Sequence, residues 1–226
     1  MLNEQAIEQF IVKYVKDGDV VSIGTSVIGE KFLVKLALAL EHEHIPINTI
    51  KFVPTSHRLA AIAGQLGMEM TSLNEDEIDV AFEFVDQIDN DFNFIKRNSY
   101  SLVRDKMIAQ SASILVAIVE QEDAMRKLQG RIPFEITSFG WKRTVNQLEM
   151  FGQARLRTEK NIPFKTESGN YIADVNIDRI FSLEDVEYKA KEIPGVLETG
   201  LFLGYADKIV IHNKKIRVLS RVEYRQ

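Results

Sequence analysis

Residues 20–32 read VVSIGTSVIGEKF, and this stretch decides how the first part of the chain folds. The apolar run Val20–Ile23 ends at Gly24, and a pattern of helical spacing begins directly after the turn. A strand that passes into a helix through a tight turn is a common place to bind phosphate, because the N–H groups at the start of the helix point toward the anion. The middle of this turn carries Val27 and Ile28, where a phosphate cradle favours glycine, serine or threonine. The stretch predicts a strand–turn–helix unit and leaves open whether the turn still holds a phosphate.

The alternation of strand and helix continues as far as Gly130. Apolar stretches predict strands at 49–57, 77–86 and 114–120, and helical patterns predict helices at 4–15, 30–39, 58–67, 101–112 and 123–130. This order predicts an α/β, Rossmann-like domain, a parallel sheet covered by helices, in which ligands bind at the carboxyl ends of the strands. Polar side chains follow three of these strands, and we expect them to form a ligand site: Thr25 and Ser26, Thr55 and Ser56, and Asp86 and Asp89.

The pattern changes after Ile132. Strands are predicted at 132–136, at 154–159, within 163–177 and at 196–203, and helices at 138–152 and 182–193. This β-α-β-β-α-β order is that of the split βαβ in a ferredoxin-like module. Residues 206–220 predict two short strands around Asn213 that return to the first domain. We therefore predict two domains, with residues 1–130 plus 206–226 forming the Rossmann-like domain and residues 131–205 forming a small ferredoxin-like α/β lid.

The composition predicts a soluble protein of a reducing, cytoplasmic compartment. Of the 226 residues, 45% are hydrophobic, and the absence of cysteine excludes disulfides and thiolate chemistry. A net charge of −5 without any long basic run argues against nucleic acid as a partner. No apolar stretch approaches the roughly 20 residues that span a bilayer, so no membrane partner is expected. His42 and His44 are two positions apart at a helix end and do not face each other, so no metal site is predicted.

Six segments resemble the type A ribose-5-phosphate isomerase family in their order and spacing. They are VVSIGTS (20–26), FVDQIDN (84–90), IKRNSYSLVRDKMIA (95–109), GNYIADV (169–175), IPGVLETGLF (193–202) and ADKIVI (206–211). Members of this family interconvert ribose 5-phosphate and ribulose 5-phosphate through an enediolate, in the pentose phosphate pathway. The resemblance implies an aldose–ketose isomerase that binds a small sugar phosphate, uses no metal or organic cofactor, and assembles as a homodimer or homotetramer.

The resemblance also implies roles for individual residues. Asp105 stands where the family has a glutamate base in a Leu-Thr-Arg-Glu-Lys run, and its side chain is one methylene shorter. Lys96 is kept from a Lys-Gly-Gly-Gly loop and is expected to support the oxyanion, whereas Asp86 and Asp89 are expected to hold sugar hydroxyls. A plainer interpretation stays open for each: a helix-surface aspartate, a basic surface turn and a solvated acidic loop.

The phosphate end of the predicted site departs most from the family. Thr25 and Ser26 are expected to contact the phosphate, but two positions of the turn that carry hydroxyls in the family are apolar here. In addition, the position of a further family lysine lies near Asp123, whose negative charge would repel a phosphate. We expect a weakened phosphate cradle, with Thr55 and Ser56 on the neighbouring turn as candidates to compensate. The alternative function is that of a catalytically impaired homologue, which kept the fold and binds a sugar phosphate or another small ligand.

Overall fold

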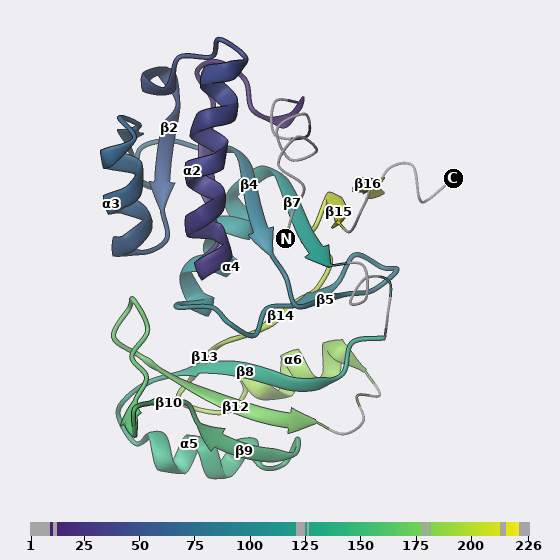
Figure 1. Cartoon of the computed structure of the whole chain (residues 1–226). Helices are drawn as coiled ribbons and strands as arrows, with labels where there is room; N and C mark the ends of the chain where they lie inside the picture. The colour runs from purple at the N-terminus through teal and green to yellow at the C-terminus, as the bar shows by residue number, and fades with distance from the viewer. Residues whose placement is uncertain are drawn as a thin grey trace.

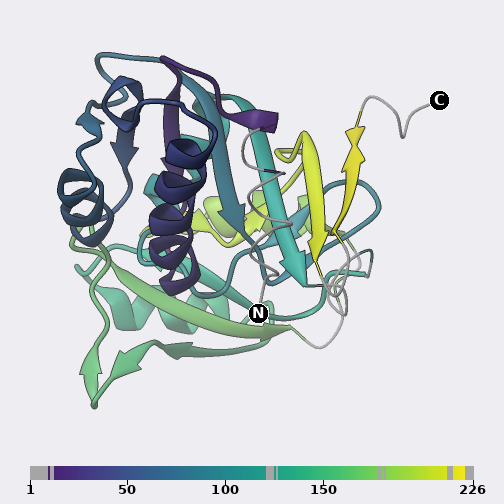
Figure 2. The same cartoon turned by 45° about the horizontal axis from the view of Figure 1, so that its top comes forward.

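The protein is built around a seven-stranded sheet, in the upper half of Figure 1. The structure is a computed structural model that describes residues 10, 13–120, 125, 127–177, 180, 182–212 and 216–221. Within this part of the chain the strand order is β16-β15-β7-β4-β1-β2-β3, and every neighbouring pair runs parallel except β15 and β16. The strands are β1 (Val20–Ile23), β2 (Lys51–Pro54), β3 (Glu69–Met70), β4 (Ile78–Phe84), β7 (Ala112–Glu120), β15 (Lys208–His212) and β16 (Ile216–Ser220). In Figure 2, β15 and β16 extend the sheet beyond β7, as predicted for two returning strands.

Helices cover both faces of this sheet, which confirms the Rossmann-like prediction. The helical elements are α2 (Val27–His42), the short 3-10 helix η1 (Ile47–Thr49), α3 (His57–Gln65) and α4 (Leu102–Ser111). Successive residues of β4 point to opposite faces: Phe82 packs in the cluster beneath α2 and α3, while Ala81 and Val85 pack in the cluster beneath α4. In Figure 1, α2 crosses in front of the sheet, and α4 lies behind it.

Each of the helices α2, α3 and α4 begins with a serine cap. Ser26, Ser56 and Ser101 precede α2, α3 and α4, and each side-chain oxygen accepts a hydrogen bond from the backbone N–H three residues later. Such caps satisfy an N–H group that the helix leaves unpaired. The βα turns are therefore fixed by local sequence, and they hold the first turns of the helices at the edge where the predicted site residues lie.

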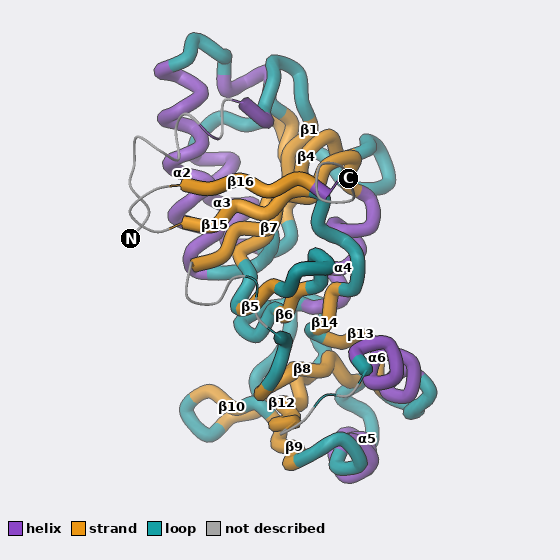
Figure 3. The backbone as a smooth tube through the Cα atoms, turned by 90° about the vertical axis from the view of Figure 1, so that its right-hand side faces the viewer, coloured by secondary structure: helices purple, strands orange, loops and turns teal. Residues whose placement is uncertain are grey.

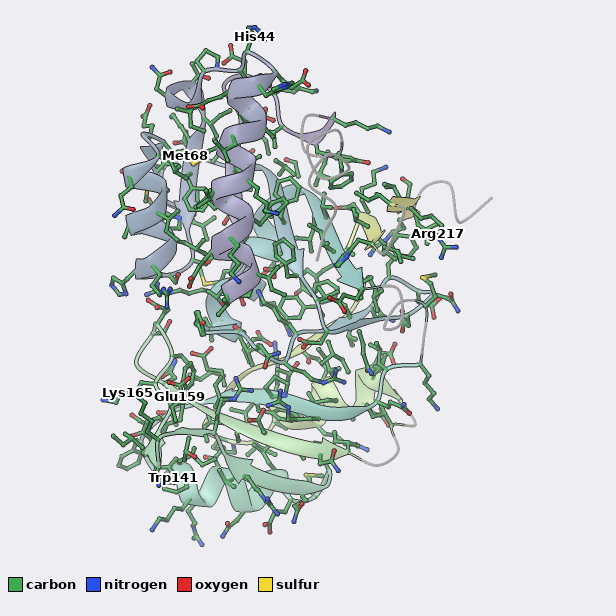
Figure 4. The ribbon with its side chains drawn as sticks, in the orientation of Figure 1. His44, Met68, Trp141, Glu159, Lys165 and Arg217 are labelled. Atoms are coloured by element: carbon green, nitrogen blue, oxygen red, sulfur yellow. The ribbon has the colours of Figure 1, made fainter. Side chains whose placement is uncertain are left out.

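A four-stranded antiparallel sheet forms the lower half of the molecule. Its elements are β8 (Gly130–Ile136), α5 (Trp141–Leu148), β9 (Gln153–Leu156), β12 (Tyr171–Ile177), α6 (Leu183–Lys191) and β13 (Val196–Thr199). The spatial order β13-β8-β12-β9 is 4-1-3-2 in sequence order, the arrangement of a ferredoxin-like module. Figure 3 shows α5 and α6 on the same side of this sheet, with a shared apolar core. In Figure 4, Trp141 lies on this lower layer, where it packs edge-on against Tyr171.

A third, small sheet connects the two layers. It consists of β5 (Gln87–Ile88), β6 (Phe94–Ile95) and β14 (Leu201–Phe202), in the order β14-β6-β5. The strand predicted at 196–203 is therefore wrong as one element, because it divides at Gly200 between β13 and β14. A short hairpin, β10 (Thr158–Glu159) with β11 (Ile162–Pro163), projects from the lower layer.

Two predicted helices fall largely outside the described residues. These are the helices at 4–15 and 123–130; within the second range, residues 127–129 are not helical and Gly130 already belongs to β8. The helix predicted at 138–152 is shorter, because it begins after Gly140, whose φ of 65° is left-handed. The exact division into domains 1–130 plus 206–226 and 131–205 stays a prediction. Among the described residues, no helix combines the length and apolar character of a membrane span.

Candidate active site

The predicted site residues gather where the parallel strands of the upper sheet end. In Figure 1 the arrowheads of β2, β4 and β7 point toward the lower sheet, so the turns that follow them lie between the two layers. A cavity of about 470 Å³ opens at this edge. Its lining comes from α2, the end of β4, the loop after β6 and the ends of β7 and β15, and includes Ser26, Ile28, Lys31, Lys35, Asp86, Lys96, Arg97, Asn98, Glu120 and His212. This is the position at which open α/β sheets bind ligands.

Asp105 lies in the first turn of α4 and is fully buried. Its Oδ1 accepts a hydrogen bond from the backbone N–H of Thr25 at 2.9 Å, and its Oδ2 accepts one from the Thr25 hydroxyl at 2.8 Å. The same Oδ2 accepts from the Ser99 hydroxyl at 2.7 Å and lies 2.6 Å from the Lys96 ammonium nitrogen. Asp105 is therefore an interior carboxylate with four donors, and its interpretation as a helix-surface residue is wrong.

Lys96 joins this carboxylate to the cavity. Its side chain is 1% exposed, it lines the cavity, and its Nζ contacts both Asp105 and Glu83. Burial alone would lower the pKa of Lys96, but the carboxylates of Asp105 and Glu83 raise it above its ordinary value. Lys96 is thus a buried, fully charged ammonium rather than part of a basic surface turn.

Glu83 is the residue of this cluster that the sequence analysis missed. It sits near the end of β4, is fully buried, and points to the same face as α4 and Asp105. Burial, with the nearby Asp105, raises its pKa to about 8, although Lys96 acts in the opposite direction. A signal was present in the sequence: in VAFEFV, residues 80–85, one carboxylate interrupts an apolar run in a strand that helices cover on both faces.

The loop after Lys96 is tied to a second carboxylate, that of Asp86. The backbone N–H of Arg97 donates to Asp86 at 2.6 Å, and the side-chain amide of Asn98 donates at 3.0 Å. Asp86 is half-buried and lines the cavity, so it lies where a sugar hydroxyl acceptor is expected. Its carboxylate also fixes the loop that carries Lys96.

Asp89 lies farther from the cluster, in the β5–β6 hairpin. It accepts hydrogen bonds from the backbone N–H groups of Asp91 and Asn93 and from the Asn93 side chain, at 2.9, 2.9 and 3.1 Å. Burial raises its pKa, and the bonds from Asn93 partly offset that effect. Asp89 does not line the cavity, and these three hydrogen bonds all come from residues of its own hairpin.

The four predicted hydroxyl residues divide between the cavity and the interior. Ser26 caps α2 and lines the cavity, whereas the Thr25 hydroxyl faces inward to Asp105 and Ser99. Thr55 is buried and donates to the Ile23 carbonyl at 2.7 Å, and Ser56 caps α3. Neither Thr55 nor Ser56 lines the cavity, so the structure does not bring them to Ser26 as a second phosphate turn.

Charged side chains surround the cavity. Lys31 and Lys35, one turn apart on α2, and Arg97 bring positive charge to it, whereas Glu120 and Asp86 bring negative charge. His212 is half-buried, and burial lowers its pKa, which favours the neutral imidazole near neutral pH. Within the described residues, no group of three or more His, Asp or Glu side chains is arranged to hold a metal ion.

The start of α4 is held in place by the lower sheet. Glu135 of β8 is fully buried; it accepts hydrogen bonds from the backbone N–H of Val103 at 3.0 Å and from the Ser101 hydroxyl at 3.3 Å. One turn farther along α4, the Lys106 ammonium lies 2.7 Å from Glu198 and 3.1 Å from Glu187. The position of Asp105, which lies between these anchors in the sequence, therefore depends on both layers.

Comparison with known proteins identifies the family. The model of the family described as ribose 5-phosphate isomerase A (phosphoriboisomerase A) matches residues 51–215. Ribose-5-phosphate isomerase A 2 of Oceanobacillus iheyensis is 32% identical over 223 residues, covering 97% of this chain and 98% of the relative. The chain belongs to the ribose 5-phosphate isomerase A family.

Solved structures of ribose-5-phosphate isomerases share the whole architecture. The enzyme of Methanocaldococcus jannaschii is 28% identical with a TM-score of 0.86, covering 96% of this chain and 98% of that one. A D-ribose-5-phosphate isomerase in complex with phospho-erythronic acid is also 28% identical, with a TM-score of 0.87 and coverage of 96% and 97%. These comparisons confirm the resemblance drawn from the six sequence segments and the fold that it implied.

The structure gives two of the departures from the expected glycine loop a role, because the side chains of Asn98 and Ser99 make hydrogen bonds that glycine could not. Arg97, Asn98 and Ser99 stand where that loop has three glycines. The Asn98 side chain donates to Asp86, and the Ser99 hydroxyl donates to Asp105. Arg97 donates to Asp86 through its backbone N–H, and its guanidinium donates to the carbonyls of Gln129 and Arg131. Hydrogen bonds to two carboxylates thus fix the loop in this member of the family.

Proposed function

We propose that this chain is a ribose-5-phosphate isomerase, which interconverts ribose 5-phosphate and ribulose 5-phosphate through an enediolate. The observation that carries the proposal is the contact of 2.6 Å between Lys96 and Asp105 at a cavity of about 470 Å³, in a chain of this family. The alternative, a non-catalytic binding protein, is not favoured, because relatives near 30% identity over almost the full length are named as isomerases.

The chemistry needs a base, an oxyanion partner and hydroxyl acceptors. In the aldose-to-ketose direction, Asp105 takes the proton from C2, and the C–H electron pair forms the C1–C2 double bond. The charge that develops on the C1 oxygen is stabilised by the Lys96 ammonium. Asp105 then returns the proton to C1, and the proton of the C2 hydroxyl passes to the C1 oxygen, so that C1 carries a hydroxyl and C2 becomes the carbonyl. Because Asp105 is fully buried, the turn at 24–26 and the loop at 96–99 have to separate when the sugar enters.

The remaining roles follow from the position of each side chain. We assign Asp86 to a sugar hydroxyl, because it lines the cavity beside Lys96. We assign the phosphate end to the wall of the cavity that α2 forms, which carries Ser26, Lys31 and Lys35. Lysine ammonium groups bind phosphate as point charges and replace the hydroxyls that the turn has lost.

Four residues with predicted substrate roles are proposed to act on the substrate through other groups: Thr25, Asp89, Thr55 and Ser56. Thr25 reaches the substrate through Asp105, to which it donates twice. Asp89, Thr55 and Ser56 are proposed to shape the walls, since each holds a turn at the edge of the sheet. The family resemblance further supports a homodimer or homotetramer that works in the cytoplasm, in the pentose phosphate pathway.

The decisive experiment is an assay of ketose formation from ribose 5-phosphate by the purified protein. We expect turnover, and we expect Asp105→Asn to reduce kcat by roughly 100- to 10,000-fold, the usual contribution of a general base. Asparagine preserves the shape of the side chain, so circular dichroism is expected to remain that of the unchanged protein. Absence of turnover at high protein concentration, with ribose 5-phosphate still raising the melting temperature, would instead support the binding protein.

A further inference from the structure

We propose that Glu135 is a positioning residue of this isomerase, which reaches from the lower sheet to the first turn of α4 and thereby fixes the place of Asp105. The proposal rests on the proposed function, because Asp105 is the base that it assigns. Glu135 does not line the cavity, so it acts on the reaction only through α4.

Glu135 is a buried carboxylate that is held by neutral groups alone. It lies on β8, and its side chain is fully buried. Among the described residues, its hydrogen-bond donors are hydroxyls, a backbone N–H and a side-chain amide. An ionisable side chain is costly at such a position, whereas an apolar one would pack there without that cost. Packing alone therefore does not account for a carboxylate at this position.

The two oxygens of Glu135 hold two different segments. Oε2 accepts from the Val103 backbone N–H at 3.0 Å and from the Ser101 hydroxyl at 3.3 Å, both at the start of α4. Oε1 accepts from the Thr166 hydroxyl at 2.8 Å and from the Asn170 side-chain amide at 2.9 Å, both between β11 and β12. The bonds to Oε1 orient the carboxylate, so that Oε2 is turned toward α4.

Ser101 transmits the position of Glu135 to Asp105. The Ser101 carbonyl accepts from the Asp105 backbone N–H at 3.0 Å. The Ser101 N–H donates to the Ser99 hydroxyl at 2.9 Å, and that hydroxyl donates to the Asp105 carboxylate at 2.7 Å. The Val103 N–H is one of the groups that the first turn of a helix leaves unpaired, and the helix dipole favours a carboxylate there. Glu135 is thus joined to both the backbone and the side chain of Asp105 by short chains of hydrogen bonds.

This anchor does not depend on the groups that the substrate displaces. Three donors to the Asp105 carboxylate lie in the turn at 24–26 and the loop at 96–99, which have to separate when the sugar enters. The bonds from α4 to Glu135 involve neither segment. They keep the helix in place while the side-chain donors rearrange, and a displacement of the base by about 1 Å would cost roughly 100-fold in rate.

The test is the steady-state kinetics of ketose formation from ribose 5-phosphate by the unchanged protein, Glu135→Ala, Glu135→Gln and the control Thr166→Val. The value of kcat is expressed per folded molecule, with the folded fraction measured by circular dichroism, so that a loss of stability alone does not change it. We expect Glu135→Ala to lower this kcat by roughly 100-fold with little change in KM, because α4 loses both bonds to the lower sheet.

The conservative variant and the control should both keep kcat within a few-fold. In Glu135→Gln the amide oxygen can accept the two bonds from α4, while the amide nitrogen faces the Thr166 hydroxyl, which can accept. Thr166→Val removes a bond from the other oxygen of the same carboxylate and leaves the bonds to α4. Equal losses of kcat in Thr166→Val and Glu135→Ala would show that contact between the layers matters rather than the hold on α4, and would overturn the proposal.

A second measurement separates a misplaced base from a slower movement of the two layers. Ribose 5-phosphate deuterated at C2 carries deuterium at the position from which Asp105 takes the proton. If Glu135→Ala misplaces the base, proton transfer limits turnover, and deuterium should slow this variant at least as much as it slows the unchanged protein. A smaller isotope effect in Glu135→Ala would mean that opening or product release has slowed instead, and would overturn the positioning role.

If Glu135→Ala does not fold, Ser101→Ala decides, with Ser182→Ala as its control. Both changes remove a serine cap from a helix, but only the Ser101 hydroxyl donates to Glu135. We expect Ser101→Ala to lower kcat per folded molecule and Ser182→Ala, in the lower layer, to leave it unchanged. Equal kcat values in the two variants would overturn the proposal.

The outcomes separate this proposal from the proposed function. An active protein in which Glu135→Ala keeps its kcat per folded molecule within a few-fold overturns the role of Glu135 alone. An unchanged protein that has no activity on ribose 5-phosphate overturns the proposed function and, with it, the positioning role.

Discussion

Replacing Glu83 by glutamine should change how the stability of the protein depends on pH. An exposed glutamate in the unfolded chain has a pKa near 4.5, whereas burial raises the pKa of Glu83 to about 8 in the folded protein. Between these two values the folded state holds a proton that the unfolded state has released. The free energy of unfolding therefore decreases as the pH rises from about 4.5 to about 8.

The magnitude follows from the same two values. At about 1.4 kcal/mol per pH unit, over roughly 3.5 pH units, Glu83 costs on the order of 5 kcal/mol once the pH exceeds about 8. This is large beside the 5–15 kcal/mol that typically separates a folded domain from its unfolded chain. Lys96 does not obscure the effect, because its pKa is raised and it stays protonated in both states over this range.

The assay is denaturant unfolding at intervals from pH 5 to pH 9. Glu83→Gln and the unchanged protein should have similar free energies of unfolding at pH 5, and the variant should become the more stable one as the pH rises. Exposed Glu77→Gln serves as the control and should follow the unchanged protein throughout. Parallel pH profiles for Glu83→Gln and the unchanged protein would show that Glu83 ionises normally in the folded state, and the reasoning would fail.

Two further predictions concern the cavity wall and the contact between the layers. The double substitution of Lys31 and Lys35 by alanine should raise KM for ribose 5-phosphate by roughly tenfold or more, with little change in kcat. The reason is that losing about 1.4 kcal/mol of attraction for the phosphate changes the affinity by one factor of ten. Steady-state kinetics measures both constants, and an unchanged KM would remove the assignment. Lys106→Ala should lower the free energy of unfolding by roughly 1–3 kcal/mol, because half-buried Glu198 and Glu187 lose this buried ammonium group and keep only that of exposed Lys191. Chemical denaturation measures this loss, and a change below about 1 kcal/mol would mean that water replaces the lysine there.

Much of the fold was predictable because local chemistry determines it. Apolar runs of four to nine residues gave the strands, and serines at the starts of α2, α3 and α4 marked the caps. The strand predicted at 196–203 failed at Gly200, where a Cβ atom would lie 2.5 Å from Pro133 and 2.8 Å from the Lys96 carbonyl. That close approach lets the chain change sheets, and it depends on residues far away in the sequence.

The site shows the same division between local and distant information. Family motifs located Asp105 and Lys96, and the structure brings these two side chains together. Glu83 was missed because the segment at 77–86 was predicted only as a strand, and its sequence alone does not say which element packs on the face that carries the glutamate. Only the cover of α4 on that face makes Glu83 an interior residue.

The turn at 24–26 answers the question that its sequence raises. Gly24 makes room for the Glu83 carboxylate. Thr25 donates to Asp105 through both its backbone N–H and its hydroxyl. Ser26 caps α2 and is the residue of the turn that faces the cavity. Because most of the turn is committed to the two carboxylates, we propose that the attraction for phosphate comes from Lys31 and Lys35, which line the cavity farther along α2. We infer that the turn has changed from a phosphate cradle into a support for the buried acid–base cluster, which is why Val27 and Ile28 are tolerated there.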